Sequence, residues 1–169
     1  TLVCTKRSWQ ILFKDAWQSF SLTKCWQTRV ASKESKPFTA SIRALASFRG
    51  LLSLHIENVH LCDEHVRVLC GIDTLQSVKL VRGAFITDKG AAHLFQLRAL
   101  HTVSLALCGT PFFIHCSPAL DAHGEPGAIT DVSVFALSVI KTLRSVNLAG
   151  CDKITDIGVT WLARMKCLE

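Results

Sequence analysis

An apolar pattern with three fixed positions recurs along this chain and keeps its spacing. It has the form L-x-x-L-x-L, in which x is any residue, and its copies begin at Leu51, Leu75, Leu100 and Leu143. The first two intervals between starts are nearly equal and the third is longer, while Leu168 follows Leu143 at the same interval as Leu100 follows Leu75. Apolar residues that alternate in this way predict a half-buried strand in each copy. The chain is therefore expected to fold as a series of similar units that bury their apolar faces against one another.

A second motif follows each strand and predicts where a helix begins. Its copies are Leu61–Asp63, Ile86–Asp88, Ile129–Asp131 and Ile154–Asp156. A carboxylate at the start of a helix accepts hydrogen bonds from free backbone amides, so Asp88, Asp131 and Asp156 are predicted to be N-cap residues. The apolar residues that follow, among them Leu94 and Phe95, have helical spacing and are predicted to face the core.

The length of the repeating unit indicates the fold. Units of about 20–29 residues with this strand pattern are typical of a leucine-rich-repeat solenoid. The expected fold class is α/β, with a curved parallel sheet on the concave side and helices on the convex side. The longer interval, from Leu100 to Leu143, holds one ordinary unit and an insertion within 109–128. This segment contains three of the four prolines and three of the nine glycines, which predicts a loop.

The eight cysteines are explained by the repeat better than by disulfides. Cys25, Cys108 and Cys151 each follow the last apolar residue of a strand by three positions. That position is expected to point into the core, where a thiol acts as a small apolar group and a weak hydrogen-bond donor. Reduced thiols are typical of an intracellular protein. We expect a cytoplasmic location first, while an organelle or the axoneme stays open.

The net charge of +6 is concentrated near the N-terminus. Residues 1–50 hold nine Lys and Arg against two acidic residues, giving +7, and residues 51–169 hold ten against eleven, giving −1. Such a basic segment can contact RNA, anionic lipid or an acidic protein, or it can be a solvated surface. No apolar run approaches the roughly 18 residues that span a bilayer, so no membrane partner is expected. Any targeting signal is expected outside these residues, because no charged-then-apolar leader is present.

The two ends of the chain resemble parts of one protein family. In the last copy, Gly150-Cys151 follows the strand, and Ile154–Asp156 and Gly158 come next. This string resembles the cysteine-containing leucine-rich repeats of F-box/leucine-rich-repeat proteins. At the other end, Leu2–Cys4 and the following tryptophans resemble the close of an F-box, although Trp9 lies further from the cysteine than in the F-box pattern.

The resemblance implies a non-enzymatic protein–protein interaction module, similar to the substrate-recognition repeats of an F-box protein in a cullin–RING ubiquitin ligase. A Skp-type adaptor would be a partner only if a complete F-box preceded Thr1, because the helices that contact the adaptor are not in this chain. The alternative is a structural scaffold subunit of a large axonemal, mitochondrial or ribosomal assembly, with RNA contact through residues 1–50. The sequence does not decide between these two hypotheses.

The spacing and the resemblance together divide the chain into three parts. Residues 1–16 are expected to be the last helix of an F-box-like or capping segment. Residues 17–49 are expected to form a first irregular repeat, in which Phe20 is a core position of the strand and a polar connection follows. Residues 50–169 are expected to hold the leucine-rich repeats, with the insertion loop at 109–128.

The residues between the apolar strand positions are expected on the concave face. These residues are Ser19, Ser21, Thr23, Ser53, His55, Glu57, Ser77, Lys79, Val81, Thr102, Ser104, Ala106, Ser145, Asn147 and Ala149. Eight of the fifteen are Ser or Thr and only Glu57 and Lys79 are charged, which favours close approach of a protein segment. The predicted partner-binding residues on this face are His55, Glu57, Ser77, Lys79, Thr102, Ser104, Ser145 and Asn147. Phe112, Phe113 and Ile114 in the loop are also predicted to bind the partner, because large apolar residues on loops often dock.

Other kinds of site find little support in the sequence. Cys108, His115, Cys116 and His123 have the donor atoms that zinc prefers, but their spacings of 7, 1 and 7 differ from those of structural zinc sites. The repeat already explains Cys108. No P-loop, dinucleotide or hydrolase motif occurs, and no nucleophile is paired with a base. We therefore expect no metal, no cofactor and no enzymatic activity.

Overall fold

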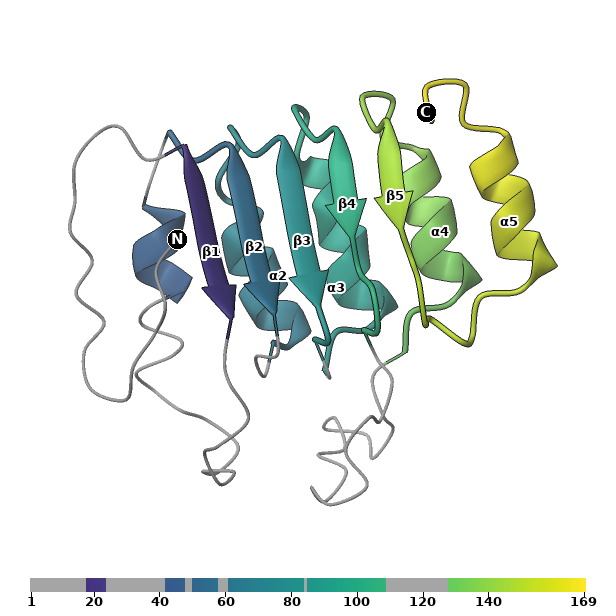
Figure 1. The fold of residues 1–169 in the computed structure, drawn as a ribbon, viewed down its shortest axis with the longest axis horizontal. Coiled ribbons are helices and arrows are strands. Elements are labelled where there is room, and N and C mark those ends of the chain that lie inside the picture. Colours follow the sequence, from purple (N-terminus) through teal and green to yellow (C-terminus); the bar gives the residue numbers. More distant parts are fainter. Residues whose placement is uncertain (1–17, 24–41, 48–49, 58–60, 84, 109–127) are drawn as a thin grey trace, which may run out of the picture.

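Within the described residues, the protein has one layer of five parallel strands and a second layer of helices behind it (Figure 1). The computed structural model describes residues 18–23, 42–47, 50–57, 61–83, 85–108 and 128–169. The strands are β1 (Ser19–Thr23), β2 (Ser53–Glu57), β3 (Ser77–Val81), β4 (Thr102–Ser104) and β5 (Ser145–Asn147). The helices are α2 (Asp63–Leu69), α3 (Asp88–His93), α4 (Asp131–Ser138) and α5 (Asp156–Ala163), with a 3-10 turn η1 (Leu94–Gln96) and a further helical segment at residues 42–46. The predicted α/β class with a parallel sheet is confirmed.

The strand order in the sheet is the order in the sequence, so each unit lies beside the next one. The middle apolar position of each copy pairs with the same position of its neighbour: Leu54 with Val78, and Val78 with Val103. Val103 in turn pairs with Val146. β1 continues this register through Phe20 and Leu54, so the strand predicted in the first irregular repeat is confirmed. We call the side of the sheet that points away from the helices the strand face.

The core lies between the sheet and the helices. Leu80 and Leu105, the last apolar positions of their copies, are fully buried, and Leu148 is partly buried against the same core. Val134 and Leu137 of α4 are fully buried in the helix layer. Period-two burial in the strands and buried helix faces behind them agree with the pattern read from the sequence.

The N-cap residues of α3, α4 and α5 are threonines, which corrects the prediction made for the aspartates. The side chains of Thr87, Thr130 and Thr155 each accept a hydrogen bond from the amide two residues later. The predicted caps Asp88, Asp131 and Asp156 are instead the first residues of α3, α4 and α5. Thr and Asp are both good caps, so the motif alone could not show which of the two adjacent side chains turns back onto its own helix.

The aspartates at the helix starts bind the next unit instead. The pairs are Asp63–Thr87, Asp88–Thr130 and Asp131–Thr155. In each pair one carboxylate oxygen accepts the Thr backbone amide at 2.8–2.9 Å, and the other accepts the Thr hydroxyl at 2.6–2.7 Å. We call these interactions the Asp–Thr contacts. Because the acceptor is charged, such hydrogen bonds are stronger than neutral ones, and they join consecutive helices at their N-terminal ends.

Gly90 lies against one of these contacts. A Cβ atom at this position would collide with a carboxylate oxygen of Asp63. In α4 the same position is Ser133, whose hydroxyl donates a hydrogen bond to the carboxylate of Asp88. The position therefore accepts either no side chain or a small hydrogen-bond donor.

The Asp131 carboxylate is expected to make stability depend on pH. Hydrogen bonds from the side chain and backbone of Thr155 hold the pKa of Asp131 below its usual value. Since the pKa is lower in the folded state, the stabilisation is present above the unfolded-state pKa of about 3.9 and is lost as pH falls through the folded-state pKa. The urea midpoint of the wild type should therefore fall more steeply below about pH 4 than that of Asp131→Asn. Urea unfolding between neutral and acid pH measures this, and parallel curves for the two proteins would contradict it.

Two predicted core cysteines are buried as thiols. The Sγ of Cys108 donates to the carbonyl of Leu80 at 3.0 Å, and the Sγ of Cys151 donates to the carbonyl of Leu105 at 3.2 Å. Each thiol thus meets a carbonyl of the preceding unit. Cys25 lies outside the described residues. The cysteines that the structure describes are all free thiols.

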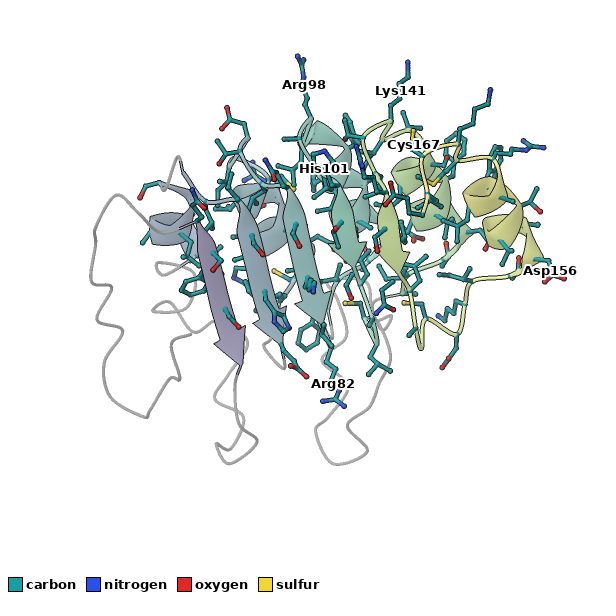
Figure 2. All side chains as sticks on the ribbon, turned by 45° about the horizontal axis from the view of Figure 1, so that its top comes forward. Arg82, Arg98, His101, Lys141, Asp156 and Cys167 are labelled. Atoms are coloured by element: carbon teal, nitrogen blue, oxygen red, sulfur yellow. The ribbon has the colours of Figure 1, made fainter. Side chains whose placement is uncertain are left out.

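In the native protein, an alkylating reagent is expected to react with the exposed described cysteine and not with the buried ones. Burial raises the pKa of Cys70 and of Cys108 to about 12, so almost no thiolate is present at neutral pH. Burial also raises the pKa of Cys151. Cys167 is exposed (Figure 2). Brief iodoacetamide treatment followed by peptide mapping should label Cys167 and spare the three buried thiols until urea unfolds the protein, and rapid native labelling of Cys151 would be the contrary result.

The prediction that Phe95 faces the core is wrong. Leu94 is buried, but the Phe95 side chain is 58% exposed. Helix α3 ends at His93 and continues as η1, whose 3-10 geometry has about 3.0 residues per turn. The tighter turn changes the direction of the side chains, so the residue after Leu94 points to solvent.

Candidate interaction surface

Most of the predicted partner-binding residues are accessible on the strand face. Lys79, Ser145 and Asn147 are exposed, and His55, Glu57, Ser77 and Thr102 are half-buried. Side chains alternate along a strand, and in β2 and β3 the residues between these positions are the buried ones. The sheet therefore presents one polar row after another on the strand face.

Ser104 is the exception, because only 5% of its surface is exposed. In the sheet it pairs with Lys79 of β3 on one side and with Asn147 of β5 on the other. Both neighbours have longer side chains, so the short side chain between them is shielded. The prediction that Ser104 offers a contact to a partner is corrected, and its two neighbours provide the accessible atoms here.

A charged cluster lies around Glu57 at the end of β2. The Glu57 carboxylate lies 3.9 Å from Nε2 of His55 and 3.5 Å from Nη1 of Arg82. All three side chains are partly exposed, so water screens the ion pairs and they add little to stability. The cluster therefore offers both signs of charge to a partner at the carboxyl end of the strands.

Sequence reasoning misses Arg82, because the alternation of the strand ends before it. Arg82 has a φ of 56°, in the left-handed region, which takes it out of the strand pattern. Leu107 and Gly150 hold the same place in the next two units, with φ of 56° and 72°. This recurrence, two residues after the last apolar strand position, is the signal that could have identified it. Figure 2 shows Arg82 projecting from the edge where the strands end, with Arg98 and Lys141 at the opposite edge.

The helix side carries a second surface. Its exposed apolar residues are Phe95, Val132, Phe135, Val139, Ile157 and Val159. The ring of Phe135 meets the ring of Trp161 edge-on, with centroids 4.8 Å apart, and the Arg164 guanidinium lies 4.9 Å from the Trp161 ring centroid. Val132 and Phe135 of α4 and Val139 at its C-cap have helical spacing, so a second apolar stripe could have been read from the sequence.

The remaining candidate residues take no part in a site that the structure describes. Phe112, Phe113 and Ile114 lie outside the described residues, as do His115, Cys116 and His123. In the part of the chain that the structure describes, no group of three or more His, Cys, Asp or Glu could hold a metal ion.

A surface depression is lined by Asp73, Gln96, Arg98 and Ala99, which include one carboxylate and one guanidinium.

Comparison with known proteins adds no relative. No protein-family model matches this chain, and no curated protein matches it. None of the helices in the described ranges combines the length and the apolar character that crossing a membrane requires. A function is therefore inferred from the residues of this chain and their geometry.

Proposed function

We propose that this protein is a leucine-rich-repeat solenoid that binds another protein through its strand face. The observation that carries the proposal is the register of the sheet, in which equal positions of the five strands pair with one another. Equal side chains then lie in rows, and one surface continues across all the units. Repeat proteins of this architecture use such extended surfaces to bind partners.

The chemistry of the strand face fits a polypeptide. The row formed by Ser53, Ser77, Thr102 and Ser145 carries short hydroxyl side chains, which let a partner backbone approach closely and can donate hydrogen bonds to it or accept them from it. Lys79 and the cluster around Glu57 supply the charges. With so few cations, the face offers less to a phosphate backbone than to a protein segment.

The role that this proposal favours is substrate recognition in a cullin–RING ubiquitin ligase. Its support is the resemblance to cysteine-containing repeats together with the thiols of Cys108 and Cys151, which bind carbonyls of the preceding unit as that repeat class would require. A Skp-type adaptor remains a partner only if a complete F-box precedes Thr1. Reduced core thiols favour an intracellular, cytoplasmic location for this role.

A scaffold subunit of a large assembly is the second candidate. The observation that favours it is the exposed apolar surface of α4 and α5, because a surface of this kind is often covered by another protein. RNA contact through residues 1–50 stays a prediction, because most of these residues lie outside the described ranges. Partner contact through the loop also stays a prediction, because Phe112, Phe113 and Ile114 lie outside them.

The test compares two double variants, each of which adds two positive charges to a different surface. Ser53→Arg with Ser145→Arg places two bulky cations on the strand face, and Val132→Arg with Ile157→Arg places two on the helix side. Each tagged variant is used for affinity capture from cell extract with quantitative mass spectrometry, and its melting curve is recorded. We expect the strand-face variant to lose the proteins that the wild type captures, while the helix-side variant retains them and both melt like the wild type.

The opposite pattern would favour the scaffold. If the helix-side variant loses the captured proteins and the strand-face variant retains them, the strand face is not the binding surface. Cullin and adaptor subunits among the captured proteins would support the ligase role, and their absence from a stable complex would count against it.

A further inference from the structure

The edge at which the strands begin carries a row of cations. Its members have the same position in three consecutive units, two residues before the first leucine of the L-x-x-L-x-L pattern: Arg98, Lys141 and Lys166. All three residues are exposed. Figure 2 shows Arg98 and Lys141 projecting from the same edge, opposite to the edge that carries Arg82. We call these three cations the basic row.

Backbone hydrogen bonds between the units keep the basic row in register. The amide of Arg144 donates to the carbonyl of His101 at 2.8 Å, and the amide of Glu169 donates to the carbonyl of Arg144 at 2.8 Å. Each member of the basic row comes three residues before one of these residues, so the row follows the same register. Neighbouring strands lie about 5 Å apart, and one short ligand can therefore reach all three cations.

The fold itself makes little use of the basic row. None of its three side chains has a hydrogen bond or an ion pair with another described residue. The three cations lie beyond the last turns of η1, α4 and α5, where the helix dipole has little effect. After α2 the same position is Asp73, so the end of a helix does not require a cation there. The row is therefore available to a partner.

The groups next to the basic row favour a polypeptide over a nucleic acid. The surface depression beside it is lined by Asp73, Gln96, Arg98 and Ala99. A second carboxylate, that of Glu169, lies 3.3 Å from the guanidinium of Arg144. A phosphate backbone would meet these carboxylates together with the cations, which opposes its binding. A polypeptide can place its own carboxylates on the cations and donate backbone amides to Asp73.

We propose that the basic row binds an acidic stretch of a polypeptide. Asp or Glu side chains of this stretch pair with Arg98, Lys141 and Lys166, and its polar backbone groups fill the depression at Asp73 and Gln96. The pairs are exposed and screened by water, so the binding is weak and depends on salt. The basic row lies at the edge of the sheet, separate from the strand face, and the inference does not rest on the function proposed above.

The test uses a tetraglutamate peptide with blocked ends as the probe and a tetraglutamine peptide as its uncharged match. Each peptide is titrated into the isotope-labelled protein at low ionic strength, and nuclear magnetic resonance spectra are recorded. We expect the signals of the basic row to shift with tetraglutamate and not with tetraglutamine. The shifts should vanish in about 1 M salt, where the Debye length is about 3 Å. Signals of the basic row that do not respond to tetraglutamate would overturn the proposal.

Two triple variants of equal net charge separate this site from a general attraction to a basic protein. One variant replaces all three residues of the basic row with Gln. The other replaces three exposed cations elsewhere: Arg43→Gln, Lys89→Gln and Lys153→Gln. The first should weaken tetraglutamate binding by about tenfold or more, because three exposed ion pairs are lost, and the second should change it by less than about twofold. Equal weakening in the two variants would overturn the proposal.

Two further measurements cover the other outcomes. Unchanged signals from β2 and β3 report that each variant is folded, and if the first triple variant does not fold, Lys141→Glu is compared with Lys153→Glu instead. Lys141→Glu should weaken tetraglutamate binding more than Lys153→Glu, and equal effects would reject the proposal. A uridine oligonucleotide of the same charge is also titrated. If it binds the basic row more tightly than tetraglutamate does, the partner is a nucleic acid and the proposal is wrong.

Discussion

Replacing Asp88 with Ala is expected to lower the free energy of unfolding by about 3 kcal/mol, because hydrogen bonds to a charged acceptor are among the strongest in proteins. Its carboxylate accepts the amide of Thr130 at 2.9 Å and the hydroxyl of Thr130 at 2.7 Å. The amide of Ser133 donates to it at 3.2 Å, and the Ser133 hydroxyl donates as well. Ala leaves these donors without their acceptor where α3 meets α4. Urea unfolding followed by circular dichroism measures the loss.

Asp156→Ala is the matched control. Asp156 has the same position at the start of its helix, and its negative charge interacts with the helix dipole in the same way. It lacks a Thr partner among the described residues, so its removal should lower stability by less than about 1 kcal/mol. Equal losses for the two variants would mean that the charge at the helix start matters and the contact between units does not.

Leu105→Ala is expected to lower the free energy of unfolding by about 3 kcal/mol, within the range of roughly 2–5 kcal/mol for such truncations in cores. Leu105 is fully buried and follows β4, between the equivalent leucines of the neighbouring units. Ala removes buried apolar surface and leaves a cavity that the paired strands on both sides prevent from collapsing. The urea midpoint of the variant should therefore be lower than that of the wild type.

Leu148→Ala removes the same atoms at the same position of the next unit. Leu148 is only partly buried, so the surface lost from the core is smaller and water already reaches part of the site. Its effect should be clearly below that of Leu105→Ala. If the two substitutions lowered stability equally, burial as the structure shows it would not explain the effect.

The spacing of the apolar residues predicts the strands and the parallel sheet well, because one core has to be filled by equal residues at equal intervals. The buried thiols of Cys108 and Cys151 follow from the same regularity. What the spacing cannot show is the partner of a side chain. Asp88 and Thr130 are far apart in the sequence, and only the fold brings them together.

The local misses have local causes. Phe95 turns outward because η1 replaces the last turn of an α-helix, and no residue in the sequence forces that change. Ser104 is shielded because its neighbours across the sheet, Lys79 and Asn147, are longer. Arg82 joins the candidate surface because its φ is positive, which the alternation of a strand does not predict.

The paired strands β4 and β5 are joined by a connection much longer than the others. Val103 of β4 pairs with Val146 of β5 in the same register in which Val78 of β3 pairs with Val103. The register is kept although the insertion within 109–128 lies between Val103 and Val146 in the sequence. The entropy of closing a chain segment grows only with the logarithm of its length, so the additional residues destabilise the pairing by about 0.5 kcal/mol. This connection can therefore change in length and sequence while the strand face keeps its geometry, which makes it the place where a new specificity could arise with the least disturbance to folding.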